Sequence, residues 1–172
     1  YLAYFSLEDY IRKAGLEVKV ERQCYRLRPV ARKTTVPGQH GQSVGQLRQE
    51  FERELLTDPA QLKTGDLVEV ELVVASKNDY EYLVVEDFKP AGLEPVEVRS
   101  GYNGNDLGAY VEFHDERVAF FVRSLARGRH SVSYRLRAEI PGRFSALPAR
   151  AWGVYAPELR ANSDENKVRI TD

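Results

Sequence analysis

Apolar and polar residues alternate along several stretches of the chain, and this alternation is the main structural signal in the sequence. The clearest stretch covers residues 132–140, and two others cover residues 68–74 and 16–20. Because successive side chains of a strand point to opposite faces, each stretch is typical of a half-buried β-strand. Beyond Arg22 the alternation changes phase, so we expect a β-bulge there.

Shorter strands and polar turns account for much of the remaining chain. The shorter predicted strands cover residues 82–85, 96–98, 110–113, 118–122 and 168–170. Turn sequences such as Lys77-Asn78-Asp79 and Pro141-Gly142 separate the strands. Many short strands with few helical patterns between them indicate an all-β fold, an immunoglobulin-like antiparallel β-sandwich.

One segment has the period of a helix. Its apolar residues recur at steps of three and four, which makes a single stripe along a helix; they are Val44, Leu47, Phe51 and Leu55. Ser43 and Gln46 have capping-box spacing at its start, and Pro59 follows its end. We therefore expect an inserted helix over about residues 43–57. Residues 29–42, rich in Pro, Gly, Gln and basic residues, are expected to form a mobile loop before it.

The 172-residue, 19.6 kDa chain contains no methionine. A chain that begins at Tyr1 is therefore interpreted as processed, trimmed or cut from a longer product. Aromatic residues crowd its start, at Tyr1, Tyr4, Phe5 and Tyr10. We expect residues 1–14 to be a remnant strand and linker of a preceding domain, and residues 15–172 to form one β-sandwich domain.

Charge and hydropathy exclude two classes of partner. Lys and Arg together number 25 against 26 for Asp and Glu, giving a formal net charge of -1. A dedicated nucleic-acid binder needs a strong basic excess, so none is expected here. No apolar run approaches the roughly 20 residues of a membrane-spanning helix, and no signal peptide is recognisable.

Residues suited to catalysis are sparse. The single cysteine, Cys24, allows neither an internal disulfide nor a multi-thiolate metal site. It falls within a predicted strand, where a small buried thiol is favoured, although a dyad with a histidine stays open. His40, His114 and His130 lack metal-ligand spacing and are interpreted as solvated. No cofactor is expected, and an enzyme using His114 or Cys24 is the least favoured class of function.

Two further polar clusters have a functional and a structural interpretation. Asn103, Asn105 and Asp106 offer oxygen atoms that Ca²⁺ would accept, but they match no calcium loop, and a polar turn is favoured. Arginines gather on two adjacent predicted strands and their turn, where a solvated surface is favoured over a basic binding face; they are Arg123, Arg127, Arg129, Arg135 and Arg137.

Residues 151–157 concentrate aromatic side chains at the end of an extended stretch that closes with Pro157. Packing at the edge of the core explains them structurally. A contact patch for a neighbouring domain explains them functionally.

The order and spacing of several motifs resemble one known family. The motifs are GDLVEVEL (65–72), YLVVED (82–87), PAGLE (90–94), YVEF (110–113), DER (115–117), YRLRA (134–138), PGRF (141–144), LP (147–148) and VYAPELRA (154–161). Together they resemble the last, tenth macroglobulin-like domain of bacterial alpha-2-macroglobulin-like proteins. The resemblance covers most of the chain from Gly65 onward.

The resemblance implies a module of a larger protease trap. In this family, cleavage of a bait region exposes a thioester made from a Cys-x-Glu-Gln motif. The only cysteine here reads Cys24-Tyr25-Arg26-Leu27, so the motif is absent. The family's last domain covers the thioester, which makes Trp152, Val154, Tyr155 and Pro157 the candidate shielding residues. Val154 stands where relatives often have methionine.

The resulting expectation is a non-catalytic C-terminal domain of a bacterial endopeptidase inhibitor. Its partners would be the thioester-type and preceding domains of the same parent chain and, through that parent, target proteases. The resemblance implies a periplasmic, cell-envelope or extracellular location. The alternative is a cell-surface β-sandwich for interaction or adhesion, with no protease-inhibitor role.

Overall fold

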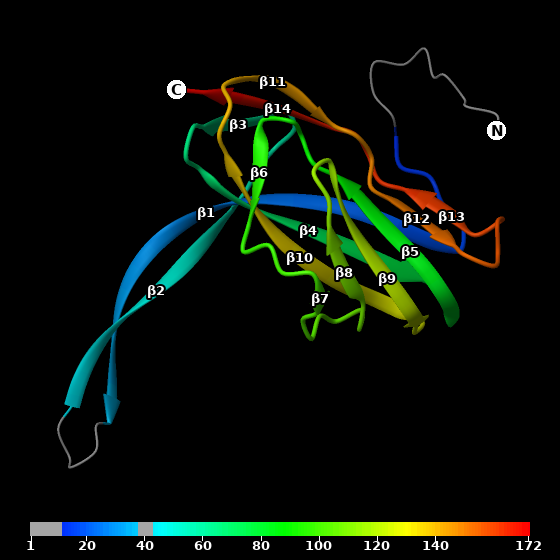
Figure 1. The fold of residues 1–172 in the computed structure, drawn as a ribbon, viewed down its shortest axis with the longest axis horizontal. Coiled ribbons are helices and arrows are strands. Elements are labelled where there is room, and N and C mark those ends of the chain that lie inside the picture. The colour runs from blue at the N-terminus through cyan, green and yellow to red at the C-terminus, as the bar shows by residue number, and fades with distance from the viewer. Residues whose placement is uncertain (1–11, 38–42) are drawn as a thin grey trace.

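The computed structural model describes residues 12–37 and 43–172, which form three β-sheets (Figure 1). The five-stranded sheet has the order β2 (Ser43–Leu55), β1 (Val18–Pro37), β4 (Leu67–Ser76), β10 (Gly128–Ala138) and β6 (Leu93–Val96). The six-stranded sheet has the order β13 (Arg160–Asn162), β12 (Arg150–Gly153), β5 (Tyr80–Phe88), β9 (Arg117–Leu125), β8 (Tyr110–Phe113) and β7 (Gly101–Tyr102). The three-stranded sheet has the order β11 (Gly142–Ala146), β14 (Asn166–Thr171) and β3 (Ala60–Lys63).

The two larger sheets face each other and enclose one core. Their inward positions alternate along the strands, as in Val68, Val70, Leu72 and Val74 of β4, all of them buried. On the opposing sheet, Phe120 of β9 is buried in the same cluster. The three-stranded sheet closes one end of the sandwich, where β14 pairs with β3 in parallel. The antiparallel β-sandwich expected from the alternation is confirmed, and the predicted strands all appear within or overlapping the observed ones.

The predicted helix over residues 43–57 is wrong. Residues 43–55 form β2, which pairs with β1 in one unbroken antiparallel register from Tyr25↔Leu55 to Pro37↔Ser43. The spacing explains the error, because Leu47, Phe51 and Leu55 are four residues apart. A step of four suits one face of a helix and, being even, also one face of a strand. No helix occurs within the described ranges, and so none that could span a membrane.

The predicted loop over residues 29–42 is also wrong for most of its length. β1 continues as a strand to Pro37, while residues 38–42 lie outside the described part of the chain. Beyond the pair Leu27↔Leu67 the partner β4 ends, so β1 and β2 extend as a two-stranded hairpin away from the sandwich (Figure 1). Such a hairpin has free edges that tolerate prolines like Pro29.

The predicted bulge beyond Arg22 does not form. β1 and β4 keep one register from Val18↔Ser76 to Leu27↔Leu67. The phase of the alternation changes because an inward position after Val20 holds Arg22, whereas Tyr25 and Leu27 lie on the opposite face of the strand. Arg22 is buried as a partner of Asp87, so a polar residue takes a core position without any change of register.

Candidate functional site

The turn after β12 carries the aromatic segment. Trp152 lies on β12 and is half-buried, whereas the next residues leave the sheet. Val154 is 49% exposed and Tyr155 is 79% exposed, and Pro157 is exposed as well. The four candidate shielding residues therefore sit together at one edge of the six-stranded sheet, and three of them face solvent.

Tyr82 of β5 supports this turn. The ring of Tyr155 packs edge-on against the ring of Tyr82, with centroids 5.4 Å apart and planes at 83°. The backbone N–H of Val154 donates to the carbonyl of Tyr82 at 2.8 Å. Tyr82 has a φ of 55°, a left-handed conformation that costs a non-glycine residue about 1–3 kcal/mol. Such strained residues cluster at functional sites, and this one is itself 43% exposed.

Backbone hydrogen bonds hold the rest of the turn in one shape. The N–H of Gly153 donates to the carbonyl of Leu159 at 3.0 Å, and the N–H of Leu159 donates to the carbonyl of Ala156 at 2.9 Å. The guanidinium of Arg160 donates to the carbonyl of Pro157 at 2.8 Å. A Cβ at Gly153 would lie 3.0 Å from the carbonyl oxygen of Ala156. The exposed side chains thus project from a closed, preorganised turn.

A row of apolar side chains leads from the turn across the outer face of the same sheet. The register aligns Tyr102 with Tyr110, Tyr110 with Phe121, Phe121 with Val84, and Val84 with Trp152. Tyr102 is 78% exposed and Phe121 is 41% exposed. The rings of Tyr102 and Tyr110 also meet edge-on, with centroids 5.2 Å apart. This aromatic row makes the outer face a candidate contact surface.

Sequence reasoning found the turn but missed Tyr82 and the aromatic row. Tyr82 is more than 70 residues from Tyr155, and nothing in a single sequence pairs them. The row depends on the register of five strands, which the alternation within each strand does not specify.

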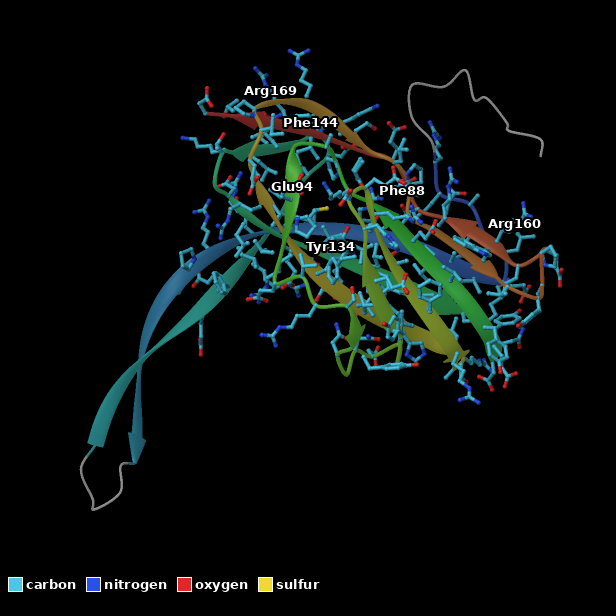
Figure 2. The ribbon with its side chains drawn as sticks, viewed as in Figure 1. Phe88, Glu94, Tyr134, Phe144, Arg160 and Arg169 are labelled. Carbon is cyan, nitrogen blue, oxygen red and sulfur yellow. The ribbon has the colours of Figure 1, made fainter. Side chains whose placement is uncertain are left out.

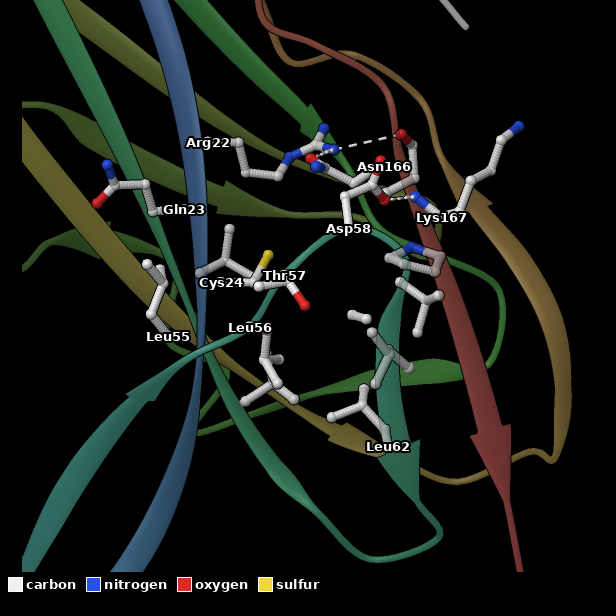
Figure 3. A pocket seen from close by; sticks show the side chains of 17 residues that line it. Arg22, Gln23, Cys24, Leu55, Leu56, Thr57, Asp58, Leu62, Asn166 and Lys167 are labelled. Atoms are coloured by element: carbon white, nitrogen blue, oxygen red, sulfur yellow. Dashed lines mark hydrogen bonds between the residues drawn. The ribbon is translucent and has the colours of Figure 1, made fainter. Parts of the chain in front are cut away.

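A cavity of about 220 Å³ lies where β1, β3 and β14 meet (Figure 3). Its walls are largely apolar, with Arg22, Asp58 and Asn166 on one side. Figure 3 shows Cys24 and Leu56 near β1 and Leu62 on β3 across the cavity. The described residues that line the cavity include no histidine, so the cavity does not bring Cys24 together with a histidine.

Burial in this wall raises the pKa of the Cys24 thiol to about 11, because its effect is larger than the lowering effect of the nearby Arg22 guanidinium. A thiol with a raised pKa is a poor nucleophile, because the thiolate is the reactive form. The side chain of Cys24 is partly buried and packs against the hydrophobic core cluster. The thiol therefore has the environment of a structural residue.

Titration of Cys24 is expected to weaken the fold at alkaline pH. The folded pKa lies above the ordinary value of 9.0, so the stability gained from the neutral thiol is complete below pH 9 and is lost toward pH 11. Between pH 8 and pH 10.5 the free energy of unfolding of the wild type should fall by about 2 kcal/mol more than that of Cys24→Ala. Urea unfolding at both pH values measures this difference, and equal losses in the two proteins would contradict it.

A buried ion pair adjoins the cavity and joins the sheets. The Nε of Arg22 donates to Oδ1 of Asp87 at 2.9 Å, and the hydroxyl of Tyr134 donates to Oδ2 of the same carboxylate at 2.6 Å. Arg22 also donates to Asn166 at 3.2 Å and to the carbonyl of Leu147. Burial and the neighbouring Asp87 raise the pKa of Tyr134 well above its ordinary value. All these polar groups are satisfied, as a structural network requires.

The histidines and the candidate calcium loop have other partners. His114 contacts Glu112 at 3.2 Å on the surface, and His130 contacts the carbonyl of Ala126 at 3.0 Å. His40 lies outside the described residues.

In the loop, Oδ1 of Asn105 accepts the N–H of Ala109 at 2.9 Å, and Oδ2 of Asp106 accepts the N–H of Ser131 at 3.1 Å. Oδ1 of Asn103 accepts from the Asn105 amide at 2.6 Å. These contacts are those of a polar turn.

Known proteins share both sequence and fold with this chain. The family model described as the Bacterial Alpha-2-macroglobulin MG10 domain matches residues 18–158. An alpha-2-macroglobulin homolog from Nostoc sp. is 26% identical over 126 residues, covering 68% of this chain and 7% of that protein. An alpha-2-macroglobulin from Thermotoga maritima is 31% identical over 122 residues, covering 63% of this chain and 8% of that protein. The chain thus spans less than a tenth of the length of these curated relatives.

Solved structures have the same fold. A Salmonella alpha-2-macroglobulin reacted with methylamine superposes with a TM-score of 0.65 at 24% identity, over 94% of this chain and 10% of that one. A trypsin-activated alpha-2-macroglobulin from Escherichia coli superposes with a TM-score of 0.65 at 21% identity, over 94% of this chain and 11% of that one. The sandwich is therefore a macroglobulin domain in its architecture.

Proposed function

The chain belongs to the bacterial alpha-2-macroglobulin family, as its MG10 domain, and from this premise we propose that it is a non-catalytic packing domain of a longer protease-trapping chain. Its curated relatives are more than ten times longer than the matched region. A domain of that relative size acts through contacts with its neighbours. The trap would work outside the bacterial cytoplasm, in the periplasm, in the cell envelope or extracellularly.

One observation carries the proposal: a preorganised apolar surface faces solvent at the turn after β12. Tyr155, Val154 and Tyr82 are held by ring contact and backbone hydrogen bonds although they are exposed. Ordering such side chains in advance lowers the entropy cost of docking. Rigid aromatic side chains of this kind dominate the binding energy of protein interfaces. The turn and the aromatic row would together contact the neighbouring domain.

The specific role proposed for the turn is to shield a thioester on that neighbour. A thioester hydrolyses when water and nucleophiles reach it, so an apolar cover slows its loss. The cover would consist of Trp152, Val154, Tyr155 and Pro157. The thioester would come from another part of the longer chain, since Cys24 lies in a cavity wall of this domain and its neighbours do not form a Cys-x-Glu-Gln motif. One relative was solved after reaction with methylamine, a nucleophile that attacks thioesters.

Removing the Tyr155 ring should expose the thioester in the full-length protein. Tyr155→Ala is expected to speed the release of thiol by methylamine about tenfold, since the loss of one aromatic contact costs about 1–2 kcal/mol at an interface. The measurement is thiol release over time, with the stoichiometry of protease trapping recorded on the same samples.

The matched control is Ile140→Ala, which removes an exposed apolar side chain beyond the end of β10, outside the six-stranded sheet. This variant should release thiol at the wild-type rate. Equal rates in wild type and Tyr155→Ala would refute shielding by the turn. A full-length protein that releases no thiol and traps no protease would instead support the adhesion-type module.

A further inference from the structure

The outer face of the three-stranded sheet concentrates positive charge. Its cationic side chains are Lys63 of β3, Arg143 of β11, and Lys167 and Arg169 of β14. Arg143 stands directly opposite Arg169 in the antiparallel register. Both arginines are exposed, and Figure 2 shows Arg169 at the outer margin of the molecule, far from the interior Tyr134. The whole chain has a net charge of -1, so this face differs sharply from the average.

Two carboxylates near this face, those of Glu165 and Asp58, are already engaged. Oε1 of Glu165 lies 2.6 Å from Nζ of Lys167, and the same carboxylate accepts the hydroxyl of Ser145. Oδ1 of Asp58 accepts the backbone N–H of Lys167 at 2.7 Å. Within the described ranges, neither Arg143 nor Arg169 has a side-chain hydrogen bond or ion pair. Like charges directly opposite each other destabilise a sheet. An external anion bound between Arg143 and Arg169 would therefore reduce their mutual repulsion.

The face is hollowed and has both apolar and cationic walls. A groove of about 520 Å³ is lined by Pro59, Gln61, Arg143, Phe144 and Arg169, among others. One wall is formed by β11, which is an edge strand of its sheet. Among the described residues β11 pairs with β14 alone, so its other edge has no strand partner. Figure 1 shows β11 along the outer border of the molecule.

We propose that this groove binds an extended acidic segment of a polypeptide, with carboxylates on Arg143 and Arg169. Guanidinium groups bind carboxylates through paired, charge-assisted hydrogen bonds, which are among the strongest in proteins. An extended segment directs alternate side chains to one face, so acidic residues at every second position would all meet the cationic sheet. The free edge of β11 can pair with the backbone of such a segment.

Two features favour a polypeptide over a phosphate-bearing ligand. The apolar parts of the groove, at Pro59 and Phe144, match side chains between the carboxylates. The unpaired edge of β11 supplies amide and carbonyl groups that a polyphosphate or lipid headgroup cannot satisfy in full. This surface lies on a different sheet from the turn after β12, so the inference stands independently of the shielding role.

The test uses a fluorescein-labelled peptide of alternating Glu and Val and the 172-residue chain, followed by fluorescence anisotropy. The wild type should bind the peptide, with affinity that falls as NaCl is raised, because salt screens exposed charges. Arg169→Glu should weaken binding about tenfold or more, since it removes one guanidinium and neutralises the other. This variant keeps the fold, because a glutamate opposite Arg143 would make a favourable cross-strand pair.

The matched control is Arg123→Glu, an exposed arginine on β9 whose replacement changes the net charge equally. It should bind the peptide like the wild type. Failure of the wild type to saturate below about 1 mM peptide would overturn the proposal. So would equal weakening in the control, or tighter binding of inorganic polyphosphate or of vesicles containing anionic phospholipid than of the peptide.

Discussion

Replacing Asp87 with alanine is expected to lower the free energy of unfolding by about 3–5 kcal/mol. Asp87 accepts from Arg22 and Tyr134 in the interior, and the side chains of Arg22 and Asp87 are almost fully buried. Without the carboxylate, the guanidinium would be a buried charge with no counter-ion. The network links β1, β5, β10 and β14, so the loss would weaken contacts between all three sheets.

Urea unfolding followed by tryptophan fluorescence measures this effect. Tyr134→Phe removes one hydrogen bond from the same carboxylate and should cost about 1–3 kcal/mol, less than the loss of Asp87. The matched control is Glu116→Ala, which breaks an exposed ion pair with Arg117 and should cost less than about 1 kcal/mol. A destabilisation by Asp87→Ala as small as that of the control would show that the buried pair contributes little.

Truncating Phe120 is expected to destabilise the domain by about 3–5 kcal/mol. Its side chain is the largest of those that are fully buried, and its ring centroid lies 6.4 Å from that of Tyr134 in the core. Phe120→Ala would remove this apolar area and leave a cavity between the two larger sheets. The relaxation of the surrounding strands is limited because both sheets hold them by hydrogen bonds.

Phe121 provides a control of the same residue type at the next position. It points to the outer face and is 41% exposed, so Phe121→Ala should cost less than about 1.5 kcal/mol. Chemical denaturation of both variants measures the difference. Equal losses would contradict the assignment of Phe120 to the core and Phe121 to the surface.

Alternation was a reliable guide wherever one face of a strand is buried and the other is solvated. The sequence predicts both β4 and β10, because their inward residues are apolar while Glu69 and Glu71 of β4 and the outward residues of β10 are polar or charged. The same logic failed at Arg22, where the inward position holds a charge paired with Asp87. It failed again over β2, where a spacing of four is compatible with either helix or strand. In both places, pairing with another segment of the chain decides the outcome.

The candidate surfaces show the same division. The turn at residues 152–157 was visible in the sequence because its residues are consecutive. Three other features were not visible, because each arises from strand register. They are the support of this turn by Tyr82, the aromatic row, and the opposed pair of Arg143 and Arg169. The arginines that gather along residues 123–137 of the sequence divide between two sheets, since Arg123 lies on β9 and Arg135 on β10.

The sequence by itself determined that this protein is an all-β sandwich of the macroglobulin type, because strand periodicity and the order of its motifs are local properties. Only the tertiary structure decided that residues 43–55 form a hairpin arm, that Arg22 and Asp87 meet in the core, and which side chains share a surface. The physical reason is that strand pairing, and the burial of a charge beside its counter-ion, are contacts between distant residues. Their free energy exists only once the sheets have formed.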